Sequence, residues 1–572
     1  MSRCVQERSG KRWELAMRKQ DDYEYGPRSG FWGNMNAWHF GAMILLGIFA
    51  LGLYALAQFY GLRTAAAMEQ ADIARQLANG QGFTTHVIRP FDLWLLDIPS
   101  EDLPQSVPVL WQAPLYPYLL ANVFRFVQLG PFSAGRGVMM AEARGVIPLG
   151  ISIFILMGMA IWCLARACME ERVAHVVFVV LLVSPISLQL VLSGGALPLA
   201  MLLTVLSTLL AWHAINRSFR DARSWLVPVY AVMAGLCVGL LFLAHYAALL
   251  VGVGLLIWLG LNLQRVRWVS VALFGLALLS VVVPRFMLVR TAGWWGVAAY
   301  PYGALLDTSV FPGDALLRDG DLVLRNWQVT AAVREGIVAR YQNLFAGQSL
   351  LGGGIIMVFF LAGLFGREER HWNQHAKWIV AAMLFLLPAF PPVLGCPYGH
   401  WPILFPLLVM FGVQAFFRIV DQEEYFDAGT QPVLLAFMVV LCVLPSAIGL
   451  VQRHGSSPYP PYHGPLQAFV SGQISEEQIM VSDIPAATAW YGQQSSLLWP
   501  RDVEHIALYE SALGGVYLAG RGHALLREDT AWIRMRTDGV VPENFPFGVG
   551  LFLPSGEKEQ ILLLRETVPE YE

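Results

Sequence analysis

The chain has 572 residues, of which 56% are hydrophobic and only 14% are charged, whereas soluble globular proteins carry about 25% charged residues. A soluble fold cannot bury that much apolar surface, so the composition predicts an integral membrane protein. The formal net charge of -3 and the lack of a basic face large enough for a phosphate backbone exclude nucleic acid as a partner.

Apolar stretches long enough to cross a bilayer, about 20 residues each, recur along the chain. They predict a mainly α, polytopic membrane protein with about eleven transmembrane helices. The predicted spans are residues 37–60, 145–165, 173–191, 197–215, 225–243, 247–263, 268–288, 351–365, 378–394, 401–417 and 432–451.

Lys and Arg in the short connections predict how the chain is oriented in the membrane. The amino-terminal segment, residues 1–36, is rich in both residues, and the connections at 166–172, 217–223, 265–267 and 367–377 carry the others. Because basic residues favour the cytoplasmic side, the amino terminus is predicted to be cytoplasmic and, after an odd number of spans, the carboxyl tail extracytoplasmic. The leading segment lacks the apolar core of a secretory signal, so the first span is expected to remain as an anchor.

This arrangement gives a membrane domain at residues 37–451 with two large outer loops, 61–144 and 289–350. The tail, residues 452–572, changes to mixed segments with turn signals. Short strands are predicted at 479–483, 550–554 and 560–565, and a helix start at 486–491. The tail is therefore predicted to be a small C-terminal α/β extracytoplasmic domain.

The most informative segment follows the first span. Residues 64–79 carry apolar side chains at helical spacing, and Gly80 and Gly82 suit a helix stop followed by a turn. Glu69 and Asp72 are three residues apart, so both project toward one side of such a helix. Two interpretations are open: an interfacial helix whose charges face water, or carboxylates held beside a bilayer for a function.

These residues carry a resemblance to a known family. The acid near the exit of the first span, the Ala-Arg-x-Leu-Ala-x-Gly-x-Gly-Phe run at 74–83 and the Pro-Leu-Tyr-Pro segment at 114–117 resemble the GT-C class of integral membrane glycosyltransferases. Within that class they are most similar to the branch of the protein O-mannosyltransferases and the lipid A aminoarabinose transferase. The resemblance implies transfer of one sugar from a polyprenyl-phosphate carrier to a glycan, lipid or protein acceptor on the outer face of a bacterial inner membrane.

The resemblance also implies roles for residues. An acid of the first outer loop acts as general base in this family, which makes Glu69 the candidate here and Asp72 the alternative. Cationic or donor groups are needed around the departing phosphate. The substrate-binding candidates are Arg89, Gln112, Tyr116, His245, Arg290, Tyr398 and His400. For the basic residues and histidines among them, the alternative is an anchor at the bilayer edge.

No cofactor is expected. The donor brings its own phosphate, and the chain has no Gly-rich phosphate loop for a nucleotide. Neither a His-x-x-x-His pair nor a similar ligand spacing occurs, so a metal is not expected. In the tail, Asp483 is predicted to cap a helix, with a contact to the acceptor as the alternative.

The chain departs from the family pattern at three places. Many relatives have an Asp-Glu pair where this chain has Ala65-Ala66-Ala67, a second acid is absent from residues 192–198, and Gln112 replaces a frequent lysine. These departures leave open an inactive relative that serves as a lipid-binding or assembly subunit. A lipid or glycan transporter is a third hypothesis, but it requires ionisable groups at mid-membrane, and no inverted repeat is found.

Overall fold

The structure is a computed structural model of the chain. It describes residues 37–62, 64–99, 102–109, 112–127, 136–220, 225–264, 266–289, 338, 354–366, 371–389, 400–422, 430–451, 464–500, 503–519, 532, 534–535, 540–542, 545–553 and 560–565. The amino-terminal segment 1–36, nearly all of the second outer loop, Arg290 and Tyr398 lie outside these residues.

The fold is mainly helical, as the composition predicted. Among the described residues, six helices are long and apolar enough to cross a membrane. They are Glu142–Cys168, Leu197–Arg220, Leu226–Ala244, Arg267–Met287, Trp401–Asp421 and Thr430–Ile448. The predicted spans at 37–60, 247–263 and 351–365 contain shorter apolar helices. The count of eleven therefore stays a prediction, whereas the polytopic helical architecture is confirmed.

A seventh candidate span is bent. Helices α8 (Glu171–Val183) and α9 (Pro185–Leu192) meet at an angle of 53°. The bend has a local cause: Ser184 adopts an extended conformation with φ −62° and ψ 130°, because the ring of Pro185 disfavours a helical residue before it. Pro185 then starts the second helix, where its fixed φ and missing N–H are tolerated.

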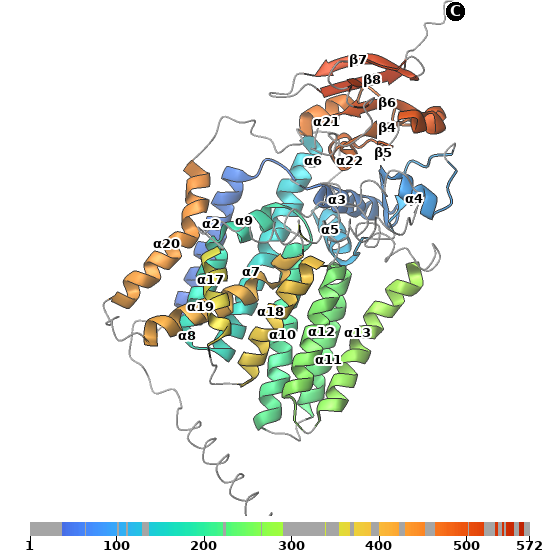
Figure 1. Ribbon diagram of the computed structural model, residues 1–572. Coiled ribbons are helices and arrows are strands. Elements are labelled where there is room, and N and C mark those ends of the chain that lie inside the picture. The colour runs from blue at the N-terminus through green and yellow to red at the C-terminus, as the bar shows by residue number, and fades with distance from the viewer. Residues whose placement is uncertain are drawn as a thin grey trace, which may run out of the picture.

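The membrane helices form a bundle in which α10 (Leu197–Arg220) packs against both α7 (Ile147–Cys168) and α11 (Leu226–Ala244). Helix α11 packs in turn against α13 (Arg267–Val289) (Figure 1). The approach is close because Gly235 of α11 faces the backbone of α13. The other helices of the bundle are α2 (Ala37–Gln58), η2 (Tyr246–Ala248), α12 (Leu249–Asn262), α17 (Ile355–Leu364), α18 (His371–Leu386), η5 (Leu387–Ala389), η6 (Trp401–Leu404), α19 (Phe405–Gln422) and α20 (Thr430–Val451).

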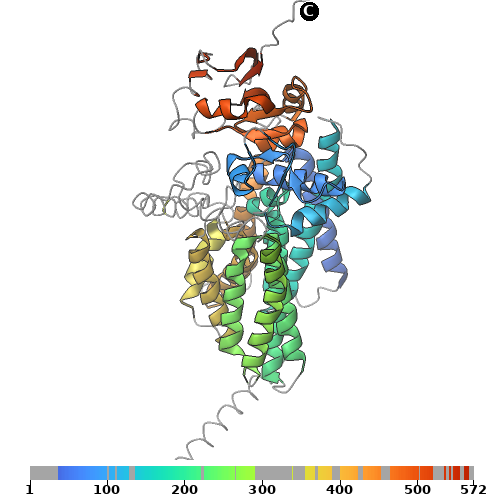
Figure 2. The same cartoon turned by 90° about the vertical axis from the view of Figure 1, so that its right-hand side faces the viewer.

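A layer built from the first outer loop lies between the bundle and the carboxyl-terminal part (Figures 1 and 2). Its main helices are α3 (Ala65–Ala78) and α5 (Leu115–Phe126), which pack against each other. The layer also contains β1 (Thr84–Thr85), β2 (Val87–Ile88), α4 (Pro90–Leu95), β3 (Val107–Pro108), α6 (Arg136–Ala141) and the π-helical turn η1 (Glu142–Val146).

The carboxyl-terminal part forms a six-stranded mixed sheet in the order β2-β5-β4-β6-β8-β7. Strands β2, β5, β4 and β6 are parallel, and β8 and β7 continue the sheet in antiparallel fashion. The tail elements are α21 (Gly464–Ser471), β4 (Ile479–Ser482), α22 (Pro485–Gly492), β5 (Ser496–Leu498), η7 (Val503–Ala512), β6 (Leu513–Leu518), β7 (Phe547–Leu553) and β8 (Gln560–Arg565). The strands predicted at 479–483, 550–554 and 560–565 overlap β4, β7 and β8, and the helix start predicted at 486–491 lies within α22.

The edge strand of this sheet comes from the first outer loop, a feature that the sequence did not predict. Strand β2 pairs with β5, and the backbone N–H of Ser496 donates to the carbonyl of His86 at 2.9 Å. The outer loop and the tail therefore share one hydrogen-bonded sheet, although the paired residues Val87 and Ser496 are more than 400 positions apart in the sequence.

The N-cap residue of helix α22 is Ile484, and not Asp483 as the sequence predicted. The helix begins after Ile484 without a side-chain cap, and a carboxylate oxygen of Asp483 accepts a hydrogen bond from the backbone N–H of Ala519 at 2.9 Å. Asp483 therefore connects the turn after β4 to the end of β6 by a hydrogen bond.

Two glycines test the helix packing. A Cβ on Gly235 would lie 2.4 Å from the carbonyl oxygen of Phe274, whereas a Cβ on Gly275 would have no atom within 4 Å. We expect Gly235→Ala to destabilise the protein by about 1–3 kcal/mol through overpacking. Gly275→Ala should be neutral or slightly stabilising because alanine is the better helix former. Thermal unfolding of the purified chain in detergent compares them, and equal midpoints would contradict the close approach of α11 and α13.

Candidate functional site

Helix α3 forms where the sequence predicted a helix, and its ends have clear causes. The Thr64 hydroxyl accepts a hydrogen bond from the N–H of Ala67 at 3.2 Å, which satisfies a free donor of the first turn. Gly80 follows the helix at φ +81°, a left-handed conformation that glycine adopts without strain. The segment thus stops the helix and turns the chain toward β1 and β2.

The charged residues of α3 do not face water. Glu69, Asp72 and Arg75 are 1%, 0% and 3% exposed, and Gln76 is buried as well. This burial excludes the interpretation of α3 as an interfacial helix with solvated charges. Because an isolated buried charge is strongly destabilising, each of these groups requires a partner.

The partner of Glu69 is Arg89, which lies just after strand β2. The guanidinium contacts both carboxylate oxygens, at 2.9 Å and 2.5 Å, and its Nη1 also lies 3.4 Å from Asp92 of α4. Burial raises the pKa of Glu69, while the charge and hydrogen bonds of Arg89 and a side-chain hydrogen bond from Gln112 offset part of that rise. The structure therefore brings three of the predicted residues, Glu69, Arg89 and Gln112, into one cluster.

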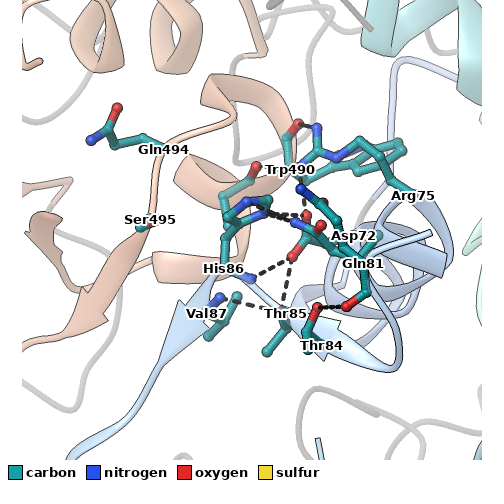
Figure 3. Close-up of polar contacts among 12 residues, drawn as sticks. Asp72, Arg75, Gln81, Thr84, Thr85, His86, Val87, Trp490, Gln494 and Ser495 are labelled. Carbon is teal, nitrogen blue, oxygen red and sulfur yellow. Dashed lines mark hydrogen bonds and ion pairs between the residues drawn. The ribbon is translucent and has the colours of Figure 1, made fainter. Parts of the chain in front are cut away.

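Asp72 accepts hydrogen bonds at both carboxylate oxygens (Figure 3). Oδ1 contacts Nη2 of Arg75 at 2.5 Å and Nδ1 of His86 at 3.0 Å, and Oδ2 accepts from the Thr85 hydroxyl and the His86 backbone N–H. Burial alone would raise the pKa of Asp72, but the charges of His86 and Arg75 and the hydrogen bonds of His86 hold it well below its ordinary value. Asp72 is therefore an ionised anchor between α3 and the start of β2.

Gln112 links this cluster to Tyr246 of η2 and Arg285 of α13. The backbone carbonyl oxygen of Gln112 accepts hydrogen bonds from the Tyr246 hydroxyl at 2.9 Å and from Nη2 of Arg285 at 3.1 Å. The Arg285 guanidinium also donates to the Tyr246 hydroxyl and lies 5.7 Å from the ring centroid of Phe83. Sequence reasoning missed Arg285, although an arginine inside the predicted span 268–288 is itself a signal of function.

Two of the predicted substrate-binding residues, His245 and His400, contact each other. Their rings meet edge to face with centroids 4.9 Å apart, and both residues are buried. Burial, aided by the neighbouring His400, lowers the pKa of His245 to about 3, so the His245 imidazole is neutral at pH 7. His245 directly precedes Tyr246, whose hydroxyl reaches Gln112. The structure thus brings the two predicted histidines into contact with each other, next to a residue that bonds Gln112.

Tyr116 lies apart from this cluster. It is buried at the start of α5, and its hydroxyl donates to the carbonyl oxygen of Gly194 at 2.8 Å. Burial raises the pKa of Tyr116. The hydrogen bond fixes the turn at residues 193–196, where Gly194 has φ +72°. Tyr116 therefore stabilises the turn at 193–196, which belongs to the segment 192–198 where the second acid of the family pattern is absent.

Within the part of the chain that the structure describes, no group of three or more His, Cys, Asp or Glu side chains could hold a metal ion. Other residues of the site were missed from sequence. Asp92 contacts Arg89, the partner of Glu69, and His86 donates its backbone N–H to Asp72. The only sequence signal of both residues is their proximity to Arg89.

Comparison with solved structures identifies the fold. ArnT from Cupriavidus metallidurans, in a structure bound to undecaprenyl phosphate, matches with a TM-score of 0.53 at 9% identity, over 92% of this chain and 98% of ArnT. The oligosaccharyltransferase from Archaeoglobus fulgidus in complex with Zn and sulfate matches with a TM-score of 0.56 at 12% identity, over 91% and 73% of the two chains.

A second structure of that enzyme, AglB in complex with an inhibitory peptide and a dolichol-phosphate, matches with a TM-score of 0.53 at 11% identity, over 84% and 70%. ArnT and AglB are both GT-C glycosyltransferases, so the chain has the GT-C fold that the sequence resemblance implied. No family model matches the chain, and no curated protein matches its sequence.

The Asp72 anchor predicts a specific pH dependence of stability. The folded-state pKa of Asp72 is depressed, so its contribution is present above the unfolded value of about 4 and is lost as pH falls below that value. Asp72→Asn leaves Arg75 and His86 without their carboxylate, and we expect a loss of about 3–5 kcal/mol at neutral pH.

Thermal unfolding in detergent between pH 3 and pH 7 measures this effect. The difference between wild type and Asp72→Asn should shrink below pH 4. Asp102→Asn, which changes an exposed carboxylate of the same loop, is the control and should behave as wild type. A constant difference at all pH values would contradict the assignment of an ionised anchor.

Proposed function

We propose that the chain is an integral membrane glycosyltransferase that transfers a sugar from a polyprenyl-phosphate carrier to a glycan, lipid or protein acceptor on the outer face of the membrane. The observation that carries the proposal is the buried cluster of Glu69, Arg89 and Gln112, in which the Gln112 backbone accepts hydrogen bonds from Tyr246 and Arg285 of the helix bundle, in a GT-C fold. The undecaprenyl phosphate bound to ArnT and the dolichol-phosphate bound to AglB support a lipid-phosphate donor.

In the proposed reaction, Glu69 is the general base. It takes the proton from the acceptor hydroxyl as the oxygen attacks the anomeric carbon, and the polyprenyl phosphate leaves without protonation. A carboxylate with a raised pKa is a better proton acceptor near neutral pH than an ordinary one. The proposal therefore assigns a catalytic use to the burial of Glu69.

Arg89 and Arg285 would provide positive charge for the phosphate. A phosphate that binds Arg89 competes with Glu69 for the guanidinium, so donor binding would release a carboxylate oxygen to accept the proton. Arg285 lies beside Gln112 at the outer end of α13, where its fork of donors suits a phosphate. The neutral His245 and its neighbour His400 would act as hydrogen-bond groups rather than as cations.

Asp72 is the weaker candidate for the base. Its oxygens already accept hydrogen bonds from Arg75, Thr85 and His86, and its depressed pKa makes it a poor proton acceptor. We therefore assign Asp72 to the support of α3.

We also propose the membrane topology and location that the sequence predicts. They are about eleven spans, a cytoplasmic amino terminus, an extracytoplasmic carboxyl-terminal domain at 452–572 and a bacterial inner membrane. The reaction as written needs no cofactor, because the phosphate that departs is already part of the donor.

A second candidate function is an inactive relative that binds lipid or supports assembly. The observation that favours it is the combination of Ala65-Ala66-Ala67 in place of the acids of many relatives with a Glu69 that is 1% exposed. A transporter has less support, because the candidate polar groups gather at one end of the helices rather than at their middle.

The proposal predicts that Glu69→Gln abolishes transfer. With a radiolabelled polyprenyl-phosphate-sugar pool in membranes, we expect the rate to fall about 10²- to 10⁴-fold at equal protein abundance, since glutamine cannot accept the proton. Asp102→Asn should transfer as wild type. Equal transfer by Glu69→Gln and wild type would exclude Glu69 as the base, and no transfer by wild type with any donor in the pool would favour the inactive relative.

Arg89 gives a pH test of the same base. The ionised form of Glu69 is the active form, so the rate should rise with pH through its pKa. Arg89→Gln removes a charge that lowers this pKa. The ascending limb of the plot of kcat/KM against pH should therefore move to higher pH. Arg89→Lys keeps the charge and should shift the limb less. The pH profile of kcat/KM measures both, and an unchanged limb in Arg89→Gln would contradict the assignment.

A further inference from the structure

Helix α22 contacts the helix that carries Glu69, and the proposed reaction gives it no role. Nη1 and Nη2 of Arg75 donate to the carbonyl oxygens of Trp490 and Ala489 at 3.2 Å and 2.9 Å. The Arg75 guanidinium also lies 5.1 Å from the ring centroid of Trp490, and Figure 3 shows the two side chains together. One arginine of α3 is therefore held by the backbone and the side chain of α22.

The same helix also contacts residues that border two of the membrane helices, Glu142 at the start of one and Leu62 just after α2. The Trp490 indole Nε1 donates to Oε1 of Glu142 in η1 at 2.7 Å, and the Trp490 ring stacks on Phe124 of α5 with centroids 6.4 Å apart. The hydroxyl of Tyr491 accepts a hydrogen bond from the backbone N–H of Leu62 at 2.9 Å. Two adjacent aromatic residues thus contact α3, α5, η1 and the chain just before α3.

Helix α22 itself has little freedom to move. Trp490 and Tyr491 are 0% and 1% exposed. A Cβ on Gly492 would lie 1.9 Å from the Ser471 hydroxyl oxygen, and a Cβ on Gly464 would lie 3.0 Å from the Tyr491 ring. Helix α21 therefore packs tightly against α22, and the strands β4 and β5 flank α22 in the sequence. A movement of α3 relative to α22 must break buried hydrogen bonds to a charge, which are among the stronger ones.

We propose that Arg75, Trp490 and Glu142 are positioning residues, through which the carboxyl-terminal region holds α3 in the register that pairs Glu69 with Arg89. Glu69 and Arg75 are six residues apart on α3, about 9 Å along the axis. A tilt at the Arg75 end therefore displaces the Glu69 carboxylate. A bidentate pair tolerates little displacement, and a misplacement of about 1 Å can cost about a hundredfold in rate.

The sheet supports this role from the other side. Strand β2 pairs with β5, and Arg89 directly follows the last residue of β2. The tail therefore fixes both partners of the pair, Glu69 through Arg75 and α22, and Arg89 through β2. The expected effect on the rate of transfer rests on the proposed function. The expected effect on the position of α3 does not.

Two conservative variants test the proposal in the full-length chain. Trp490→Phe keeps a ring on Phe124 but removes the N–H donor to Glu142, and Arg75→Lys keeps the charge but cannot reach both carbonyls with a planar fork. The matched control is Trp499→Phe, since Trp499 is a buried tryptophan of the same region that packs on Trp532. Each variant is measured for kcat, for KM of the polyprenyl-phosphate-sugar, and for amide hydrogen exchange of peptides covering residues 65–78.

We expect both variants to lower kcat by 10- to 100-fold with KM for the donor within twofold of wild type, and to speed exchange in α3 at least tenfold. Trp499→Phe should leave all three quantities unchanged. Glu142→Gln, which keeps an oxygen acceptor for the indole, should retain kcat within threefold, whereas Glu142→Leu should behave like Trp490→Phe.

Two results would overturn the positioning role: exchange in α3 that is the same in Trp490→Phe, Arg75→Lys and wild type, or wild-type kcat in both variants. If the wild-type chain transfers no sugar, the proposed function fails, and the exchange measurement alone then decides whether α22 holds α3.

Discussion

The structure depends on the burial of charge on helix α3. A helix with two carboxylates and an arginine in the interior is tolerated only when each charge has a partner, because an isolated buried charge is prohibitively unfavourable. Glu69 is paired with Arg89, Asp72 with Arg75 and His86, and Arg75 also with two carbonyls of α22. These partners come from the outer loop and from the tail, so the charges of one helix require both segments to fold around it.

This constraint explains the layered arrangement. The outer-loop helices lie between the membrane bundle and the carboxyl-terminal sheet (Figures 1 and 2), and the sheet takes its edge strand β2 from the loop. The same loop reaches the bundle through Gln112, whose carbonyl accepts from Tyr246 and Arg285. Glu69 thus lies where the outer loop and the strand β2 of the sheet meet, in the same cluster as Gln112, which contacts the membrane helices.

Sequence reasoning found the local features and missed those made by distant contacts. The helix at 64–79, its glycine stop, the tail strands and most long spans follow from periodicity and capping, which act over a few residues. The pairing of Glu69 with Arg89 was not derivable, because helical spacing fixes the face on which a carboxylate lies but not the segment that covers it. Arg285 was missed although its position in an apolar span was a signal, whereas Trp490 and Tyr491 carried no signal of their contacts with α3 and Leu62.

The most direct test is a cryo-electron microscopy structure of the full chain with bound polyprenyl phosphate. We expect phosphate density within hydrogen-bond distance of Arg285 or Arg89, beside Gln112, with at least one oxygen of Glu69 released from Arg89 and facing the phosphate. Density at another part of the helix bundle, with the Glu69–Arg89 pair closed, would contradict the claim that this buried pair is the reaction site.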